Sequence, residues 1–193
     1  MFEESEGYRG VQRDGLYGFV DSRGRLRIAN RYQDIGRFKQ GLAPVKILGK
    51  WGFVDMHDNI VINPNYEQAS EFENGVSVVR RNGLFGILST EGKVLLPLRY
   101  DSITRTGEKF LIYSKSKVGL ADLKGNVLIE PRFQALRVVS EDLVLVSDGV
   151  LWGALTADGL PVIPIMYHAL CYNEVTAHFL AKEDKGWQQW RAQ

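Results

Sequence analysis

The heptapeptide Gly49-Lys-Trp-Gly-Phe-Val-Asp55 decides the fold of this chain, because its aromatic-Gly pair returns along the sequence at a nearly constant spacing. The pair recurs every 33 or 34 residues, with Val118-Gly119 at the one place where the aromatic residue is missing. A fixed period of this length is the signature of a repeat architecture. We expect the pair to be structural throughout, which assigns this role to Tyr17, Gly18, Trp51, Gly52, Phe85, Gly86, Gly119, Trp152 and Gly153.

Three further columns keep the same period. Counted from the first residue of each pair, position 15 is aromatic in every repeat: Tyr32, Tyr66, Tyr100, Phe133 and Tyr167. Position 11 is aliphatic: Ile28, Ile62, Leu96, Ile129 and Ile163. Position 7 is Gly, or Asp58 in one repeat, and lies between apolar runs, which predicts a hairpin turn with a positive φ. We interpret the aromatic columns as core rather than as a platform for stacking sugars.

Each repeat is predicted to hold three strands. In the first full repeat, residues 18–21 and 26–28 flank the hairpin turn, and residues 42–47 follow after a polar loop. β-branched and aromatic residues are frequent in these segments, as is typical of strands. A unit of this size cannot bury its apolar face alone, so neighbouring units are expected to stack and share a core.

The sequence therefore predicts an all-β chain, in which three-stranded antiparallel meanders from tandem 34-residue repeats stack into one open twisted array. The alternative is a closed propeller-like ring of about six blades, but a repeat this short leaves little room for the four strands of a blade. We expect one domain over residues 1–193. It comprises a half unit at 7–16, units starting near 17, 51, 85, 118 and 152, and a degenerate cap at 186–193, where Gly186-Trp187 inverts the pair.

Composition and charge exclude several classes of protein. The 24 basic and 23 acidic residues nearly balance, so no general field attracts nucleic acid or an anionic membrane. The single cysteine, Cys171, cannot form an internal disulfide, which favours the cytoplasm. The opening MFEESEGYRG has no basic start and no apolar run, so no signal peptide is expected. The longest uncharged stretch, residues 159–173, is too short to span a membrane.

The repeat resembles a known family. Gly49–Asp55, Ile60–Pro64, Tyr66 and the segment Phe72–Val79 together resemble the bacterial WG, or KWG, β-repeat, and the likeness extends from about Gly7 to Ala154. This resemblance implies a repeated scaffold without catalytic residues. Short members without a signal are similar to immunity proteins of contact-dependent growth inhibition and related toxin systems. The resemblance therefore implies a cytoplasmic protein that neutralises a protein toxin. We expect a monomer in a 1:1 complex, and the acidic loops described below favour a basic toxin, such as an RNase or other nuclease.

Motifs for catalysis or metal binding are absent from the sequence. There is no phosphate-binding Gly-rich loop, no G-x-S-x-G, no H-E-x-x-H and no C-x-x-C. His168, Cys171 and His178 lie in one divergent repeat but lack a fourth zinc ligand, so neither a metal nor a cofactor is expected. The recurring Asp21, Asp55 and Asp122 are interpreted as turn-capping residues rather than as an acid–base pair. We expect no enzyme, and the alternative to an immunity protein is a non-catalytic module for envelope glycans.

Charged residues recur in two kinds of loop. Acidic residues precede the third strand, and the predicted partner-binding residues are Glu73, Glu108, Glu141, Asp142 and Glu174; Glu6 has the same place in the half unit, where the first full repeat has Lys39-Gln40. The hairpin turns instead carry Arg23, Arg25, His57, Lys93 and Lys124. We expect an acidic ridge that binds a basic partner, and a separate, more basic edge. That edge is interrupted by Glu91 and Asp158 and has no interleaved aromatic residue, so direct binding of nucleic acid is not expected.

Overall fold

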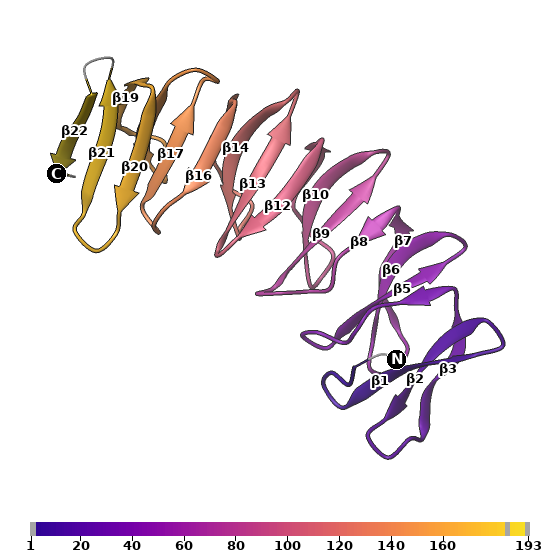
Figure 1. The fold of residues 1–193 in the computed structure, drawn as a ribbon. Helices are drawn as coiled ribbons and strands as arrows, with labels where there is room; N and C mark the ends of the chain where they lie inside the picture. Colours follow the sequence, from indigo (N-terminus) through magenta and orange to yellow (C-terminus); the bar gives the residue numbers. More distant parts are fainter. Residues whose placement is uncertain (1–2, 184–185, 192–193) are drawn as a thin grey trace. The chain divides into compact units, whose positions relative to one another are not determined.

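The computed structural model describes residues 3–183 and 186–191, which form antiparallel sheets joined by loops (Figure 1). The chain divides into two compact units, Met1–Tyr100 and Asp101–Gln193. The predicted all-β class is confirmed. None of the described residues forms a helix long and apolar enough to cross a membrane. Lys185 and the last two residues of the expected cap lie outside the described residues.

Unit 1 contains three sheets, each an antiparallel meander. The first sheet consists of β1 (Tyr8–Arg13), β2 (Leu16–Asp21) and β3 (Leu26–Tyr32). The second consists of β4 (Asp34–Ile35), β5 (Leu42–Ile47), β6 (Lys50–Asp55) and β7 (Ile60–Tyr66). The third consists of β8 (Gln68–Ala69), β9 (Val76–Arg81), β10 (Leu84–Ser89) and β11 (Val94–Tyr100).

Unit 2 repeats this plan. Its first sheet consists of β12 (Ser102–Thr106), β13 (Lys109–Ser114), β14 (Lys117–Asp122) and β15 (Val127–Phe133). Its second sheet consists of β16 (Ala135–Val138), β17 (Leu143–Ser147), β18 (Trp152–Thr156) and β19 (Pro161–Tyr167). Its third sheet consists of β20 (Ala169–Asn173), β21 (His178–Glu183) and β22 (Gly186–Arg191).

The three predicted strands of each repeat are present, and a short strand that the sequence analysis did not expect precedes the third one. Every sheet is an open meander, and within each unit the sheets follow one another as a stack, as predicted (Figure 1). The sheets do not coincide with the sequence repeats. β5 pairs with β6 of the following repeat rather than with β3 of its own, because a two-residue turn, Leu48-Gly49 with positive φ at both residues, joins β5 to β6.

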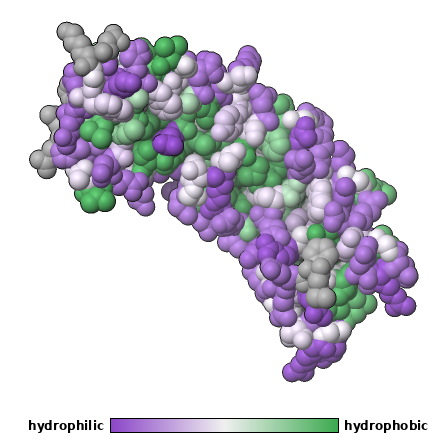
Figure 2. Space-filling view, in the orientation of Figure 1, coloured by the Kyte–Doolittle hydropathy of each residue, from purple (hydrophilic) through white to green (hydrophobic). Residues whose placement is uncertain are grey.

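The core lies between stacked sheets and uses the predicted columns. Phe53 and Ile62 pack with Phe72 and Val79 of the next sheet, and the rings of Phe53 and Phe72 are 4.7 Å apart. The column at position 15 is buried in every repeat, from Tyr32 to Tyr167. Figure 2 shows hydrophobic residues gathered along the strands and hydrophilic residues at the strand ends on the visible face of each unit.

The aromatic residue of the pair lies at the border of the core. Trp51, Phe85 and Trp152 are half-buried, and the fully buried side chain is that of Phe53, two residues after Trp51. The Lys46 ammonium lies 5.9 Å from the centre of the Trp51 ring, and the Arg80 guanidinium lies 5.5 Å from that of Phe85. The core interpretation therefore holds fully for the position 15 column. In the motif column Val118 is buried, while Tyr17, Trp51 and Trp152 pack against the core as half-buried residues. Trp51 and Phe85 also form cation–π contacts.

Glycine is required at the second position of the pair for a steric reason. Trp51 faces Tyr66 and Phe53 faces Ile62, so residues 63–65 of β7 bulge opposite Gly52 alone. A Cβ atom at Gly52 would lie 2.5 Å from the carbonyl oxygen of Ile62. The same close approach occurs at Gly18, Gly86, Gly119 and Gly153. The repeat therefore requires glycine because a neighbouring backbone occupies the place of a side chain.

The last sheet corrects the expected inversion of the pair. Lys182 faces Trp187 across β21 and β22, as Ser147 faces Trp152 in the preceding sheet. Trp187 is therefore the equivalent of Trp152, and Gln188 stands where the other sheets have glycine. Among the described residues no strand pairs with the outer edge of β22, so no bulge crosses residue 188 and a side chain fits there.

The recurring aspartates cap hairpin turns, as predicted. The Asp55 carboxylate accepts hydrogen bonds from the backbone N–H groups of His57 and Asn59, at 2.8 and 2.9 Å. The side-chain amide of Asn59 also donates to it, and this bond, followed by those from the backbone, holds the pKa of Asp55 below its usual range. Ser89 takes the same place in the third sheet, where its Oγ accepts from the N–H of Lys93.

Asp55→Ala is expected to destabilise unit 1 near pH 7, and the loss is expected to shrink in acid. A lowered pKa in the folded state means that ionised Asp55 stabilises the fold above the unfolded pKa of about 4, and that this stabilisation is lost as pH falls through the folded pKa. Urea unfolding of the wild-type chain and of Asp55→Ala across this pH range measures the difference between their free energies of unfolding. The difference in unfolding free energy between Asp55→Asn and Asp55→Ala should not depend on pH, since neither side chain titrates there. If Asp55→Ala lowered the free energy of unfolding equally at every pH, the capping role of the carboxylate would be contradicted.

Candidate functional site

The two kinds of charged loop lie at the same end of each sheet, which we call the loop end. In an antiparallel meander the first and third connections return to the same end. The strand register shows this directly. Leu42, the first residue after the loop that precedes the third strand of its repeat, faces Asp55, the last residue before a hairpin turn. Lys109 faces Asp122 in the same way. The expected separation of an acidic ridge from a basic edge is therefore wrong. The opposite end of the sheets carries the short turns, such as Leu48-Gly49.

In unit 1 the residues of the loop end hold the sheets together. The Glu6 carboxylate accepts hydrogen bonds from the backbone N–H groups of Gln40 and Gly41, at 2.7 and 2.9 Å, and the Gln40 side chain accepts one from Gly75 at 2.8 Å. Arg37 pairs with Glu71 at 3.1 Å. The charges of unit 1 are therefore interleaved with opposite charges and backbone donors along the stack.

Asp58 takes part in the same contacts between sheets. It has a positive φ of 69°, as its place in the glycine column requires. Its carboxylate accepts a hydrogen bond from the hydroxyl of Tyr32 in the preceding sheet and pairs with Arg31 at 2.8 Å. Burial of the Tyr32 ring, together with this hydrogen bond, raises the pKa of Tyr32 to about 12. The one exception in the glycine column thus joins the first sheet to the second.

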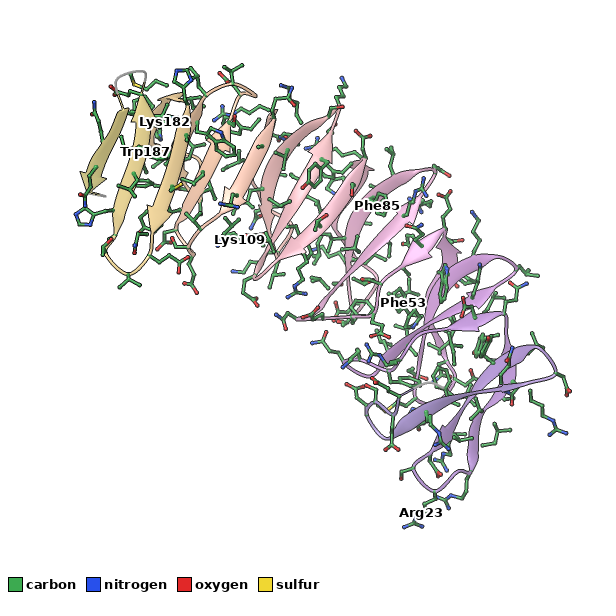
Figure 3. The ribbon with its side chains drawn as sticks, in the orientation of Figure 1. Arg23, Phe53, Phe85, Lys109, Lys182 and Trp187 are labelled. Carbon is green, nitrogen blue, oxygen red and sulfur yellow. The ribbon has the colours of Figure 1, made fainter. Side chains whose placement is uncertain are left out.

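In unit 2 the loop end contains a concavity of about 570 Å³. Its lining comes from two neighbouring sheets: Thr106, Gly107, Glu108 and Lys109 from one, and Val138, Val139, Ser140, Glu141 and Asp142 from the next. The ammonium of Lys109, labelled in Figure 3, donates to the carbonyl oxygen of Glu141 at 2.7 Å. Arg105 donates to the carbonyl oxygen of Gly107 at 3.1 Å and lies 3.9 Å from the Glu108 carboxylate.

The concavity coincides with a change in the repeat. Phe38 and Phe72 are fully buried in the corresponding loops of unit 1. Thr106 and Val139 stand at the same distance from the motif, and both line the concavity. No aromatic side chain lines the concavity. Sequence analysis missed this hollow, although the loss of phenylalanine from the column is a signal for it.

The repeats match a known protein family. A family model for the WG containing repeat matches residues 17–51, 51–85, 85–116 and 119–152. The chain belongs to the WG-repeat family. A comparison with curated proteins finds no match.

Solved structures share the fold of this WG-repeat chain at low identity. Hsv2 from Kluyvelomyces marxianus is 8% identical, with 99% of this chain and 70% of that chain covered and a TM-score of 0.44. A eukaryotic initiation factor is 12% identical, with 94% and 58% covered and a TM-score of 0.50. The N-terminal domain of Nup159 is also 12% identical, with 98% and 60% covered and a TM-score of 0.45. These likenesses concern the fold alone.

The predicted partner-binding residues of the WG-repeat chain divide between the two units. Glu108, Glu141 and Asp142 meet at the concavity of unit 2. Glu174 lies in the exposed loop after β20, at the loop end of the next sheet. Glu73 belongs to unit 1, where it precedes β9.

The loop end of unit 2 is acidic in the WG-repeat chain. Its loops are residues 107–108, 123–126, 139–142, 157–160 and 174–177. Among these residues, all of them described, Lys124 is the one cation, against Glu108, Glu141, Asp142, Asp158 and Glu174. The acidic character predicted for the whole chain therefore belongs to this unit, because in unit 1 the acidic residues alternate with Arg23, Arg25, Arg37, Lys39 and Lys93.

The candidate metal ligands of the WG-repeat chain do not form a site. Cys171 is exposed on β20 and faces Leu180, while His178 faces Asn173. Within residues 3–183 and 186–191, no three side chains of the metal-binding types lie close enough to hold an ion. His57 lies in the hairpin loop after β6.

Proposed function

We propose that this WG-repeat protein is a cytoplasmic immunity protein that binds a basic protein toxin, such as an RNase or another nuclease, and blocks it without catalysis of its own. The observation that carries the proposal is the meeting of Glu108, Glu141 and Asp142 at one concavity of unit 2. A nuclease presents a basic surface to its phosphate substrate, and an acidic concave surface complements such a surface in both charge and shape.

A non-catalytic role agrees with how the repeat uses its residues. The motif glycines accommodate the bulges, the aspartates cap turns and the position 15 aromatics fill the core. The polar side chains that recur are thus engaged in the scaffold. Variation is left to the loop end, where the two units differ in charge, and a preformed surface of this kind suits binding of a protein partner. The single cysteine supports the cytoplasm as the place of action.

The alternative is a non-catalytic module for envelope glycans. It draws support from the half-exposed rings of Trp51, Phe85 and Trp152, since sugars stack on aromatic faces. Lys46 and Arg80 already lie over two of these rings, which counts against stacking of a sugar there. The acidic concavity has no role in that alternative.

The proposal predicts association that depends on salt. The toxin to test is a basic nuclease domain encoded next to the gene for this chain. Glu108→Lys with Glu141→Lys is expected to lower the association rate about tenfold at 0.1 M salt, because long-range attraction accelerates encounter. The difference should shrink at about 1 M salt, where the Debye length falls to about 3 Å. Stopped-flow mixing at both salt concentrations measures the rates.

Two single reversals serve as controls. Each changes the charge by half as much as the double reversal. Glu130→Lys does so on the exposed part of β15 in unit 2, and Glu73→Lys at the loop end of unit 1. Both should leave the association rate within about twofold, since neither residue lines the concavity. Equal slowing by Glu130→Lys and by the double reversal would remove the concavity as the binding surface, and a toxin without affinity for the chain would refute the immunity function.

A further inference from the structure

The carboxylates that line the concavity of unit 2 differ in how the chain engages them. Arg105 lies 3.9 Å from the Glu108 carboxylate. The ammonium of Lys109 binds the main-chain carbonyl oxygen of Glu141, and it does not pair with the carboxylate of that residue. Across the described residues 3–183 and 186–191, no hydrogen bond or ion pair engages the carboxylates of Glu141 and Asp142. These two groups are therefore available to a ligand.

The free carboxylate of Glu141 results from a change in the repeat. Glu141 stands where the earlier repeats have Glu6 and Gln40. In unit 1 these two side chains accept hydrogen bonds from the next turn, at the backbone N–H groups of Gly41 and Gly75 respectively.

The turn that follows Glu141 in the stack caps itself instead. The side-chain oxygen of Asn173 accepts hydrogen bonds from the backbone N–H groups of Val175 and Thr176, at 3.0 and 3.1 Å. This turn therefore does not need the Glu141 carboxylate, and the scaffold leaves that group unused.

The loop that carries both carboxylates is fixed in place by bonds to its main chain. The N–H of Val139 donates to the carbonyl oxygen of Leu143 at 3.1 Å. The carbonyl oxygen of Asp142 accepts a hydrogen bond from the N–H of Ala157 at 2.8 Å. Between them, the carbonyl oxygen of Glu141 accepts the bond from the lysine ammonium. Little conformational freedom remains to be lost when a ligand binds to this loop, which favours affinity.

The lining of the concavity combines an apolar part with an acidic one. Val138 and Val139 are half-buried and line it beside the two free carboxylates. Its volume of about 570 Å³ is within the range of roughly 300–1,000 Å³ that is typical of ligand pockets. An arginine side chain matches this lining, because it has an apolar stem and a planar cationic head with five N–H donors. Two neighbouring carboxylates can accept from several of these donors at once, whereas a lysine ammonium offers three.

We propose that the concavity receives one arginine side chain of the basic toxin. The arginine stem packs against Val138 and Val139. The guanidinium binds the carboxylates of Glu141 and Asp142. This inference rests on the proposed function for the identity of the partner. It also divides the work of the acidic residues: Glu108 contributes to attraction at a distance, whereas Glu141 and Asp142 hold the toxin after encounter.

The first test needs no toxin. N-acetyl-arginine amide, added to the wild-type chain up to about 50 mM, should shift the backbone amide NMR signals of residues 138–142 in a saturable way, with a millimolar Kd. N-acetyl-citrulline amide has a similar shape without the charge, and it should bind at least about tenfold more weakly. Glu141→Gln with Asp142→Asn should weaken binding of the arginine probe to the same extent, since the hydrogen bonds lose their charge.

A matched pair of substitutions controls for net charge. Asp158→Asn with Glu174→Gln removes the same charge at the loop end of unit 2, but neither residue lines the concavity. The Kd of the arginine probe should change by less than about twofold. No saturable shift at residues 138–142 of the wild-type chain, or equal weakening by the two pairs of substitutions, would overturn the proposal.

Kinetics with the toxin form the second test. Val139→Phe adds a ring to the lining and leaves every charge in place, so the toxin should dissociate at least about tenfold faster while its association rate stays within about twofold. This effect should persist at about 1 M salt, because it does not depend on long-range attraction. Glu141→Gln with Asp142→Asn should also accelerate dissociation, which provides a second variant if Val139→Phe does not fold. Circular dichroism establishes that each variant is folded.

The outcomes separate this inference from the proposed function. A toxin that binds the wild-type chain, but leaves the folded variants at the wild-type rate, would overturn the arginine site and leave the immunity function intact. A toxin without affinity for the chain would refute the immunity function and the toxin as the source of the arginine. The probe titration would then still decide whether the concavity binds an arginine side chain.

Discussion

Phe53→Ala is expected to lower the free energy of unfolding of unit 1 by about 4 kcal/mol, because a fully buried ring is removed and the cavity cannot collapse. Phe53 is 0% exposed and packs against Phe72 of the next sheet. The loss of stability should therefore affect both sheets that share this contact, and not only the sheet that contains Phe53. Urea unfolding, followed by a probe specific to unit 1, measures the change.

The matched control is Trp51→Ala in the same strand. Trp51 is the larger side chain and the more conspicuous in the sequence, yet it is half-buried, so its removal should cost about half as much as that of Phe53. An equal or larger loss for Trp51→Ala would show that the motif aromatic is the true core residue. The assignment of the core to the residue two places later would then fail.

Gly52→Ala is expected to cost about 3 kcal/mol, as overpacking against a backbone does when the neighbour cannot move aside. The new methyl group would lie 2.5 Å from the carbonyl oxygen of Ile62 and 2.7 Å from the nitrogen of Pro64. The bulge of β7 would have to shift, and with it the pairing that places Tyr66 opposite Trp51. Thermal and urea unfolding of the variant give the loss.

Gly49→Ala separates this steric effect from the loss of a flexible residue. Gly49 has a positive φ of 77°, but no atom lies within 4 Å of the place of its Cβ atom. Its substitution should cost about 1 kcal/mol, the strain of a left-handed alanine. Equal losses at Gly49 and Gly52 would indicate that the motif glycine serves turn conformation rather than close approach of the backbone.

The sequence by itself determined the period, the hairpin turns and the residue types of the core columns. These features are local or periodic: Asp55 caps a turn within four residues, and Gly24 or Asp58 supplies a positive φ at its own place in the chain. Tyr66 and Ile62 recur at a fixed distance from the motif because each repeat packs in the same way. The family followed from the same residues, since its model matches four successive repeats.

The tertiary structure decided which strands pair, which aromatic residues are buried and where the charges meet. β5 pairs with the following repeat and the first and third connections of each meander return to one end, so the two rows of charged loops share it. The candidate site arose in the same way. Glu108 and Glu141 are 33 residues apart, and only the stacking of two sheets brings them to one concavity, which Thr106 and Val139 also line. Such contacts depend on partners in other repeats, and no single repeat carries that information.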